Sequence, residues 1–265
     1  MTALEEAKRL GCETVQIFTH APRQWRRPRI GDEEAAAFRA RQKECALYPL
    51  VVHTPYLPNL CTTSERLYLR SKVALKDDLE VCEKLGADFF VVHPGAYSDE
   101  SAPEEGMKRL SDAFNEALSG PGKTRVLLEN MAGGGRRLGS HWSELKRMLE
   151  EISASDRVGV CFDTAHTWGA GHAFSNAAEV DRTLDAVEQA IGLGRVYVIH
   201  ANDTKAVHGS HRDLHQHIGQ GKMGEEVFAA LLADPRLKQC AVILETPKDD
   251  PAADMRNLAT LRRLM

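Results

Sequence analysis

The stretch Val158-Gly-Val-Cys-Phe-Asp-Thr-Ala-His166 indicates the fold more clearly than any other part of the chain. An apolar run stops at Asp163, and a histidine follows three positions later. Continuous apolar runs of this kind are typical of parallel strands that are buried on both faces. In a parallel barrel, the side chains at the carboxyl ends of the strands converge on one mouth. We therefore predict a buried strand that presents Asp163 and His166 to a common site.

The same pattern, an apolar run that stops at a polar or metal-binding residue, occurs seven times along the chain. Six of the runs stop at a histidine or a carboxylate, and these six residues follow one another at intervals of 34 to 45 positions. Such an interval accommodates one strand, one helix and two connecting loops. The runs are 15–18 before Thr19, 50–52 before His53, 89–92 before His93, 126–128 before Glu129, 158–162 before Asp163, 196–199 before His200 and 241–244 before Glu245.

Amphipathic helical patterns fill the intervals between the apolar runs. Apolar residues recur at helical spacing among charged residues in 71–85, and similar patterns cover 143–152 and 177–191. The chain has 265 residues, which is close to the roughly 250 residues of a typical (β/α)₈ barrel. We therefore predict the α/β class and a TIM-type (β/α)₈ barrel, forming a single domain over residues 1–265.

The amino-terminal pattern departs from a complete barrel. The apolar spacing of Leu4, Ala7 and Leu10 predicts a helix ahead of the first apolar run. Seven strand candidates can then be counted, whereas the barrel needs eight. We expect the first strand to be missing from this chain, which would leave exposed strand edges at 15–18 and 241–244.

Composition favours a globular protein of the cytoplasm. Hydrophobic residues make up 43% and charged residues 27% of the chain, and no run approaches the roughly 18 apolar residues of a membrane span. The first residues are rich in charge, where a signal peptide would be apolar. The six cysteines form no CxxC pair, so we expect buried, reduced thiols. The net charge of −4 neither indicates nor excludes a nucleic-acid ligand, because a local basic surface is enough to contact phosphates.

Histidine and carboxylate residues form the candidate functional set. Beyond the strand ends, His166 lies in the quoted stretch, and Asp213 and His215, two positions apart, point to the same side if extended. Imidazole and carboxylate donors suit zinc, or manganese or iron, whereas magnesium and calcium favour oxygen alone. At about three protein ligands per catalytic ion, the set is large enough for two or three ions. The predicted metal ligands are His53, His93, Glu129, Asp163, His166, His200, Asp213, His215 and Glu245.

Each candidate also has a purely structural interpretation. A single histidine at a strand end is more often a hydrogen-bonded structural residue than a metal ligand, and a single carboxylate there is often an ion-pair partner. Six such strand ends at the same place in a repeated unit favour a shared metal site instead. We interpret most of the remaining histidines as surface or supporting groups: His20, His141, His172, His208, His211 and His217.

The motifs together resemble the endonuclease IV family of abasic-site endonucleases, which are trinuclear zinc (β/α)₈ barrels. Each motif alone is weak, but their order and spacing are specific and cover nearly the whole chain. They are Arg23-Gln-Trp25, His53-Thr-Pro-Tyr-Leu57, His93-Pro-Gly95, Glu129-Asn-Met-Ala-Gly133, Asp163-Thr-Ala-His166, His200-Ala-Asn-Asp203, Gly209-Ser210, Asp213-Leu-His215, Gly219-Gln-Gly221 and Leu244-Glu-Thr246.

The resemblance implies three zinc sites and a hydrolytic reaction. One ion would be held by His53, His93 and Glu129, the second by Glu129 with Asp163, His200 and Glu245, and the third by His166, Asp213 and His215. Such a cluster fits phosphodiester hydrolysis by a metal-activated water. Glu129 and Glu245 are then the predicted catalytic residues, with Glu245 helping to position the attacking water.

The resemblance also implies a substrate, namely duplex DNA with a missing base. The family cuts on the 5′ side of the abasic site, leaves a 3′-hydroxyl and a 5′-deoxyribose phosphate, and trims blocked 3′ ends. Arg23, Tyr56 and Leu57 match positions that enter the base stack. A basic cluster, Arg23, Arg26, Arg27 and Arg29, suits phosphate contacts. We expect a monomer without a protein partner, associated with the nucleoid when it acts on DNA.

Two alternatives stay open on the sequence alone. A sugar isomerase or epimerase of the xylose-isomerase-like barrels would also collect histidines and carboxylates at strand ends, but such enzymes need fewer metal ions. The trio His166, Asp213 and His215 and the surface residues Arg23 and Tyr56 argue against that enzyme class. The second alternative is a DNA-binding barrel that is inactive because its first strand is missing.

Overall fold

The computed structural model of the protein describes residues 2–25, 29–98 and 101–265. The chain divides into two compact units. Unit 1 takes the chain as far as Leu128 together with Arg147–Gly159, and unit 2 consists of Glu129–Lys146 and Val160–Met265. The expectation of a single domain over the whole chain stays a prediction.

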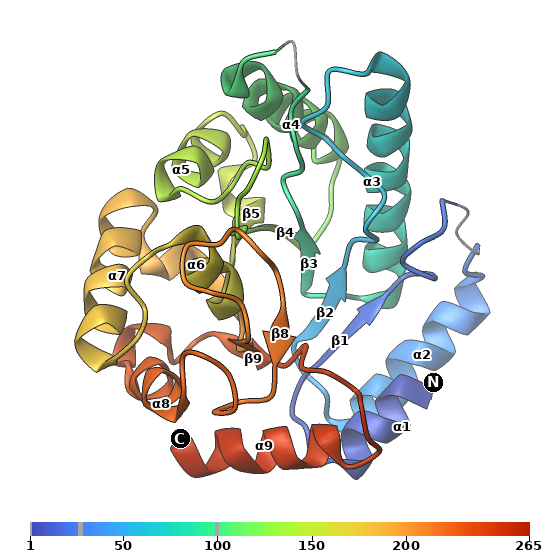
Figure 1. Ribbon diagram of the computed structural model, residues 1–265. Coiled ribbons are helices and arrows are strands. Elements are labelled where there is room, and N and C mark those ends of the chain that lie inside the picture. The colour runs from blue at the N-terminus through green and yellow to red at the C-terminus, as the bar shows by residue number, and fades with distance from the viewer. Residues whose placement is uncertain (1, 26–28, 99–100) are drawn as a thin grey trace. The chain divides into compact units, whose positions relative to one another are not determined.

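Unit 1 alternates helices with short parallel strands (Figure 1). The strands are ordered β1-β2-β3-β4, so neighbours in the sheet are also neighbours in the chain. Strand β4 and helix α5 each cross the boundary between the units. The elements are α1 (Thr2–Arg9), β1 (Val15–Phe18), α2 (Asp32–Cys45), β2 (Leu50–His53), α3 (Glu65–Leu85), β3 (Phe89–Val92), α4 (Pro103–Ala117), β4 (Arg125–Glu129), α5 (Trp142–Glu150) and the 3₁₀ turn η1 (Ser155–Arg157).

Strands β2, β3 and β4 are mostly buried, whereas all four residues of the edge strand β1 are half-buried. Leu50, Val51 and Val52 of β2 have no exposed surface, which agrees with a strand covered on both faces. Helix α3 ends where Gly86 adopts a left-handed conformation with φ of 71°, which glycine does at little cost. The turn that follows lets β3 start at Phe89 and run parallel to β2.

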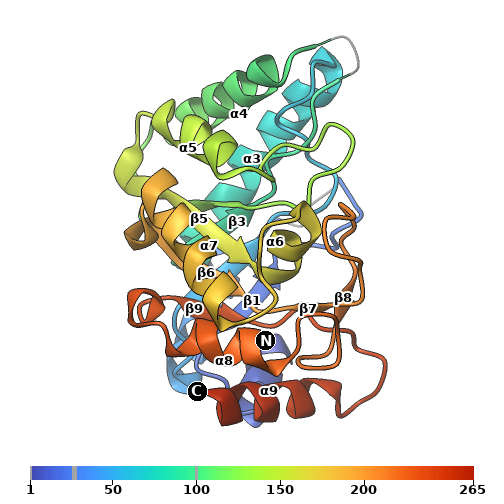
Figure 2. The same ribbon diagram turned by 60° about the vertical axis from the view of Figure 1, so that its left-hand side comes forward.

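Unit 2 repeats the strand and helix alternation. Strands β5, β6 and β9 are parallel and adjacent in that order, and the short strands β7 and β8 form a separate antiparallel pair. Helices α7, α8 and α9 pack in succession (Figure 2). The elements are β5 (Val158–Asp163, which begins in unit 1), α6 (Thr164–Ala170), α7 (Ala177–Ala190), η2 (Leu193–Arg195), β6 (Val196–His200), β7 (Asp203–Thr204), β8 (His215–Gln216), α8 (Glu225–Ala233), η3 (Pro235–Leu237), β9 (Ala241–Ile243) and α9 (Ala253–Leu264).

The structure confirms the predicted order of strands and helices. All seven apolar runs are strands, with ends that differ from the predicted ones by no more than one residue. In the described part of the chain, helix α1 comes first and no strand precedes β1, as expected. Among the described residues, none of the helices combines the length and the apolar character that crossing a membrane requires.

Candidate metal centre

Four of the predicted ligands in unit 2 stand at or just beyond the carboxyl ends of strands. Glu129, Asp163 and His200 are the last residues of β4, β5 and β6, and Glu245 follows the end of β9 by two positions. The pairing of β5 with β6 sets Asp163 beside His200, and the pairing of β6 with β9 sets His200 beside Ile243. The register of these strands therefore brings polar side chains to one end of the sheet.

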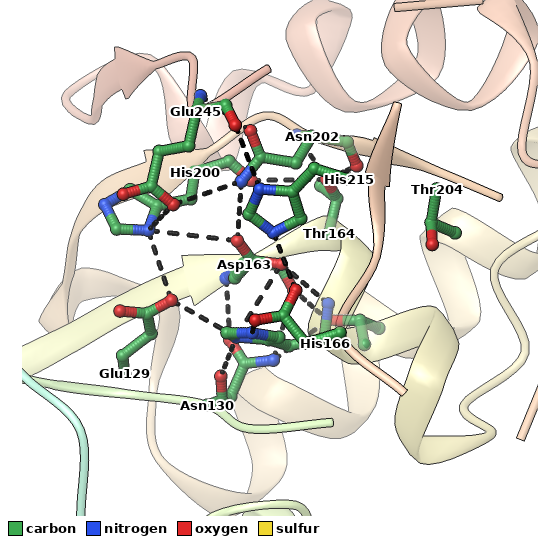
Figure 3. Close-up of polar contacts among 12 residues, drawn as sticks. Glu129, Asn130, Asp163, Thr164, His166, His200, Asn202, Thr204, His215 and Glu245 are labelled. Atoms are coloured by element: carbon green, nitrogen blue, oxygen red, sulfur yellow. Dashed lines mark hydrogen bonds and ion pairs between the residues drawn. The ribbon is translucent and has the colours of Figure 1, made fainter. Parts of the chain in front are cut away.

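Three carboxylates surround the Nδ1 atom of His200 (Figure 3). This nitrogen lies 3.2 Å from Glu129 Oε1, 3.2 Å from Glu245 Oε2 and 3.8 Å from Asp163 Oδ2. One potential ligand atom from each of the four residues lies within 4.8 Å of the others. Glu129 and Asp163 are buried, whereas the Glu245 side chain is 26% exposed. This arrangement of oxygen and nitrogen atoms could enclose one cation.

A second group of donors centres on Asp213, whose two oxygens face two different imidazoles. Asp213 Oδ2 lies 3.3 Å from His166 Nε2, and Asp213 Oδ1 lies 2.9 Å from His215 Nε2. His166 and His215 also form a group with Asp163 in which one ligand atom of each residue lies within 4.8 Å of the others. The second group therefore adjoins the first through Asp163.

The local sequence of residues 158–166 explains why Asp163 and His166 come together. Asp163 ends β5 and is also the N-cap of α6, because its Oδ1 accepts a hydrogen bond of 2.6 Å from the backbone N–H of His166. Aspartate is a favoured N-cap because its carboxylate satisfies an N–H that has no partner within the helix. The spacing of three residues between Asp163 and His166 is thus the spacing of a capped first turn.

Backbone carbonyls fix the orientation of three imidazoles. The Nδ1 atoms of His53, His166 and His215 lie 2.7 Å from Thr54 O, 2.9 Å from Asn130 O and 3.0 Å from Glu245 O, respectively. A carbonyl only accepts hydrogen bonds, so Nδ1 carries the hydrogen and donates it. Nε2 is then the atom that each ring offers to a cation, as in most metal-binding histidines. The orientation of these rings fits a metal site.

His53 and His93 belong to unit 1, whereas the other seven predicted ligands belong to unit 2. The two rings meet edge to face, with centroids 4.9 Å apart and an interplanar angle of 88°. Phe18 also packs against His53, at a centroid distance of 5.5 Å. The structure therefore brings together the two imidazoles that follow β2 and β3 in the predicted scheme.

The charges in unit 2 depend strongly on one another. Burial alone lowers the pKa of His166 and His200, but neighbouring anionic groups outweigh it, so the pKa of each lies well above the usual value. The same balance raises the pKa of His215 to about 9. Burial raises the pKa of Asp163. For Asp213, the hydrogen bonds from the imidazoles overcome burial and hold the pKa well below its usual range. The clustered carboxylates are therefore stabilised by positive charge, either protons on the imidazoles or metal ions.

Sequence reasoning missed three uncharged residues that contact this site. Asn130 and Asn202 are buried carboxamides, and both bond Asp163. Cys161 lies with Glu129 and His200 in a further group of potential ligands, and burial raises its pKa to about 12, which keeps the thiol neutral. All six cysteines are free thiols, as expected, but only four of them are buried, and Cys12 and Cys240 are half-buried. Asn130 is next to Glu129, and Cys161 and Asn202 are each two positions from a predicted ligand. This proximity in sequence is the signal that could have identified them.

The predicted DNA-contacting residues lie in unit 1. Arg23 is exposed, Tyr56 is 59% exposed and Leu57 is partly buried. The Tyr56 backbone N–H donates a hydrogen bond of 3.0 Å to Pro22 O, which joins the segments that carry Arg23 and Tyr56. Of the predicted basic cluster, Arg29 is exposed, whereas Arg26 and Arg27 lie outside the described residues.

Comparison with known proteins agrees with this geometry. Residues 4–264 match the family model described as "Xylose isomerase-like TIM barrel". The chain is 40% identical to "Probable endonuclease 4" of Methanosphaerula palustris over 265 residues, which cover 99% of this chain and 93% of that protein. The crystal structure of endonuclease IV from Thermus thermophilus matches with a TM-score of 0.88 and 36% identity, over 99% of this chain and 93% of the other.

A more distant likeness concerns the fold alone. A D-tagatose 3-epimerase-like protein of known structure matches with a TM-score of 0.73 but only 19% identity, over 98% of this chain and 91% of that one. At this level of identity the match shows a shared fold and nothing further. The match over nearly the full length of proteins named endonuclease 4, together with the groups of potential metal ligands in unit 2, shows that this chain belongs to the endonuclease IV family of xylose isomerase-like TIM barrels.

Proposed function

We propose that this chain is a DNA repair endonuclease that hydrolyses the phosphodiester on the 5′ side of abasic sites in duplex DNA. The products would be a 3′-hydroxyl and a 5′-deoxyribose phosphate, and blocked 3′ ends would be trimmed by the same site. Three zinc ions would take part, although manganese or iron also suits the donor set. The protein would act as a monomer on chromosomal DNA in the cytoplasm.

One observation carries the proposal, namely the crowding of carboxylates around imidazoles that are held in position for metal binding. Nδ1 of His200 has three carboxylates within 3.8 Å, and His166 and His215 turn their Nε2 atoms to Asp213. Carboxylates at such distances repel one another unless cations are present. A cluster of divalent ions would remove this repulsion and could catalyse phosphodiester hydrolysis.

The residues would divide among the three ions as follows. Asp163, His200 and Glu245 would hold one ion together with Glu129, and His166, Asp213 and His215 would hold another. For the third ion we propose His53, His93 and Glu129. The last paired residues of β3 and β4 are Val92 and Leu128, and the next residue along each chain segment is His93 and Glu129, respectively.

Ions bound there would supply Lewis acidity, which activates a water molecule near neutral pH and stabilises charge on the leaving oxygen. Glu245 is the residue best suited to orient the attacking water. Its side chain is 26% exposed, whereas those of Glu129 and Asp163 are 1% and 0% exposed. An accessible carboxylate beside the scissile phosphate could accept a hydrogen bond from water while the buried ones serve only as ligands.

Recognition of the lesion would fall to unit 1. We propose that Tyr56 and Leu57 enter the base stack at the abasic site and that Arg23 enters it as well. Tyr56 is exposed, but its ring also contacts Phe18 edge to face, with the ring centroids 5.9 Å apart. A supported aromatic side chain is suited to replace a missing base in the stack.

A sugar epimerase remains the runner-up for this fold, and the second donor group argues against it. A proton-transfer enzyme needs one metal ion and a base, whereas unit 2 gathers His166, Asp213 and His215 in addition to the donors around His200. The inactive DNA-binding barrel differs from our proposal only in turnover. Cleavage and metal content measured together therefore separate the three functions.

The test uses a labelled duplex with one synthetic abasic site and the purified full chain. We expect incision on the 5′ side, a product end that a DNA polymerase extends, and two to three metal ions per chain measured by mass spectrometry on the same preparation. Chelation should remove both metal and activity. Glu245→Gln should abolish incision, whereas Glu226→Gln, on the outer helix α8, should not.

Each alternative has its own outcome. Bound metal and tight binding to the abasic duplex without incision would establish the inactive barrel. Bound metal with epimerisation of a ketohexose, and no incision, would establish the sugar enzyme. Absence of bound metal in zinc-supplemented preparations would refute the proposed chemistry altogether.

A further inference from the structure

Glu245 needs a support that the β-sheet does not provide. Strand β9 ends at Ile243, and its ladder with β6 ends at the pair His200 and Ile243. Just beyond that pair, the Ala201 backbone N–H donates a hydrogen bond of 2.8 Å to Ile243 O. Glu245 lies two residues further on, and groups outside this ladder contact its backbone and its carboxylate, among them His215 at its backbone O and His200 at its carboxylate.

The carboxamide of Asn202 contacts Glu245 at both places (Figure 3). Asn202 Oδ1 accepts a hydrogen bond of 2.8 Å from the Glu245 backbone N–H, and Asn202 Nδ2 donates one of 3.3 Å to Glu245 Oε2. Nδ2 also donates a bond of 2.7 Å to Asp163 Oδ2. An amide nitrogen has two hydrogens, so each carboxylate receives one of them.

Asn202 is itself held rigidly. Its side chain is fully buried, its backbone N–H donates to Thr164 Oγ1 at 2.9 Å, and the Thr164 hydroxyl donates to Asn202 O at 2.7 Å. Buried polar groups that are fully hydrogen-bonded hold one conformation. Thr164 follows Asp163 directly in the chain, so the same short segment anchors Asn202 and supplies one of the carboxylates that it contacts.

The two oxygens of Asp163 consequently have separate tasks. Oδ1 caps α6 by accepting the His166 N–H, whereas Oδ2 accepts from Asn202 and faces His200 Nδ1 at 3.8 Å. The carboxamide thus sets the angle of the Asp163 carboxylate as well as the position of Glu245. It does so without adding charge, which leaves the carboxylates able to bind a cation.

We propose that Asn202 is a positioning residue that aligns Asp163 and Glu245 as joint ligands of one metal ion and holds Glu245 for catalysis. This inference rests on the proposed function, because it assigns Asn202 a role in that same site. Partners that orient metal ligands typically change metal affinity or activity 10-fold to 100-fold when they are removed. We expect a change of this size for Asn202.

The test compares the full-length wild type with Asn202→Ala and Asn202→Asp. Asn202→Asp keeps the volume and the acceptor for Glu245 N–H, but it turns an oxygen toward Asp163 and Glu245 in place of the amide hydrogens. Both variants should lose about one metal ion per chain, or release it at least 10-fold faster to a chromophoric chelator. On the abasic duplex, kcat should fall at least 10-fold while KM changes little, because Asn202 is not expected to contact DNA.

A matched control separates positioning from loss of a buried amide. Asn257 is a buried carboxamide of α9 that bonds Ile218 N–H, Thr246 Oγ1 and Ala253 O. Asn257→Ala should lower the free energy of unfolding but keep the full metal complement. Thr164→Val, which removes the hydroxyl that holds Asn202, should release metal faster than wild type even if Asn202→Ala fails to fold.

The possible results differ clearly. Asn202→Asp with wild-type metal content, release rate and kcat would overturn the inference, and so would equal metal loss in Asn257→Ala. If wild-type protein binds metal without cutting DNA, the proposed function fails but the metal measurements on the variants still decide the role of Asn202. Wild-type protein that binds no metal would overturn both.

Discussion

Raising the pH of the metal-stripped protein should destabilise it. The carboxylates of unit 2 hold protons on neighbouring imidazoles, and this effect brings the pKa of His215 to about 9. A histidine in the unfolded chain titrates near about 6.5. A folded-state pKa above the unfolded value stabilises the fold fully at pH values below about 6.5, and this stabilisation is lost as the pH rises through about 9.

The size of the effect follows from the two pKa values. The difference between about 9 and about 6.5 corresponds to about 3 kcal/mol of unfolding free energy. The His215 side chain is only 18% exposed, so solvent screens this interaction weakly. The pKa values of His166 and His200 are also raised, so their titration acts in the same direction. We therefore expect a loss of at least about 3 kcal/mol between pH 6.5 and 9.5.

The assay is urea unfolding at several pH values, with a chelator in one series and excess zinc in the other. Zinc competes with protons for the imidazoles, so its binding strengthens as the pH rises. The zinc series should then gain stability over the range in which the chelator series loses it. His215→Gln should reduce the loss of unfolding free energy in the chelator series, with His166 and His200 accounting for the loss that remains, whereas His141→Gln, at an exposed position outside the site, should leave the loss unchanged.

Two results would refute this reasoning. A chelator series whose unfolding free energy stays constant or rises from pH 6.5 to 9.5 would mean that the carboxylates do not stabilise the protonated form of the imidazoles. A fall in His215→Gln as large as that of the wild type would show that His215 does not contribute to it. In either case the negative charge around His215 would stabilise its protonated form less than the structure indicates.

Three further changes test the site and its surroundings. Glu129→Ala should abolish cleavage and reduce bound metal while the circular dichroism spectrum stays native, because it removes a ligand rather than apolar packing; retained wild-type cleavage would contradict the mechanism. Tyr56→Ala should lower the preference for abasic over intact duplex, measured by competition binding with metals still bound, and an unchanged preference would exclude the wedge. Gly221→Ala should lower the unfolding free energy by about 1 to 3 kcal/mol in urea, because a Cβ there would lie 2.2 Å from Asp203 Oδ1 and 2.5 Å from Thr204 O; unaltered stability would show that this loop shifts at little cost.

The strands could be predicted because buried parallel strands leave a strong signal. The run 89–92, for example, is apolar throughout, and the structure has it as β3. Helix α6 leaves no such signal. All but the last of its residues are buried, so Thr164–Ala170 has no polar face and therefore no helical periodicity. Strands β7 and β8, at two residues each, are too short for any pattern to emerge.

The candidate site was predictable where it consists of titratable residues at strand ends. Asp163, His200 and Glu245 came from their places after apolar runs, and the structure brings them together. Asn130 and Asn202 were missed because an uncharged amide is common in loops and indicates no chemistry by itself. How His53 and His93 combine with the donors of unit 2 stays a prediction. The pairing of β2 with β3 places these two histidines relative to each other but not relative to unit 2.

The use of carboxamides as supports has a physical reason. A lysine or arginine beside Asp163 and Glu245 would position them equally well, but its permanent charge would neutralise them and weaken metal binding. Asn202 donates hydrogen bonds to both carboxylates and carries no charge. The imidazoles that pair with the carboxylates give up their protons when a metal binds. Supports of these two kinds keep the ligands in place while leaving their negative charge available, which is what a site that must gather several cations requires.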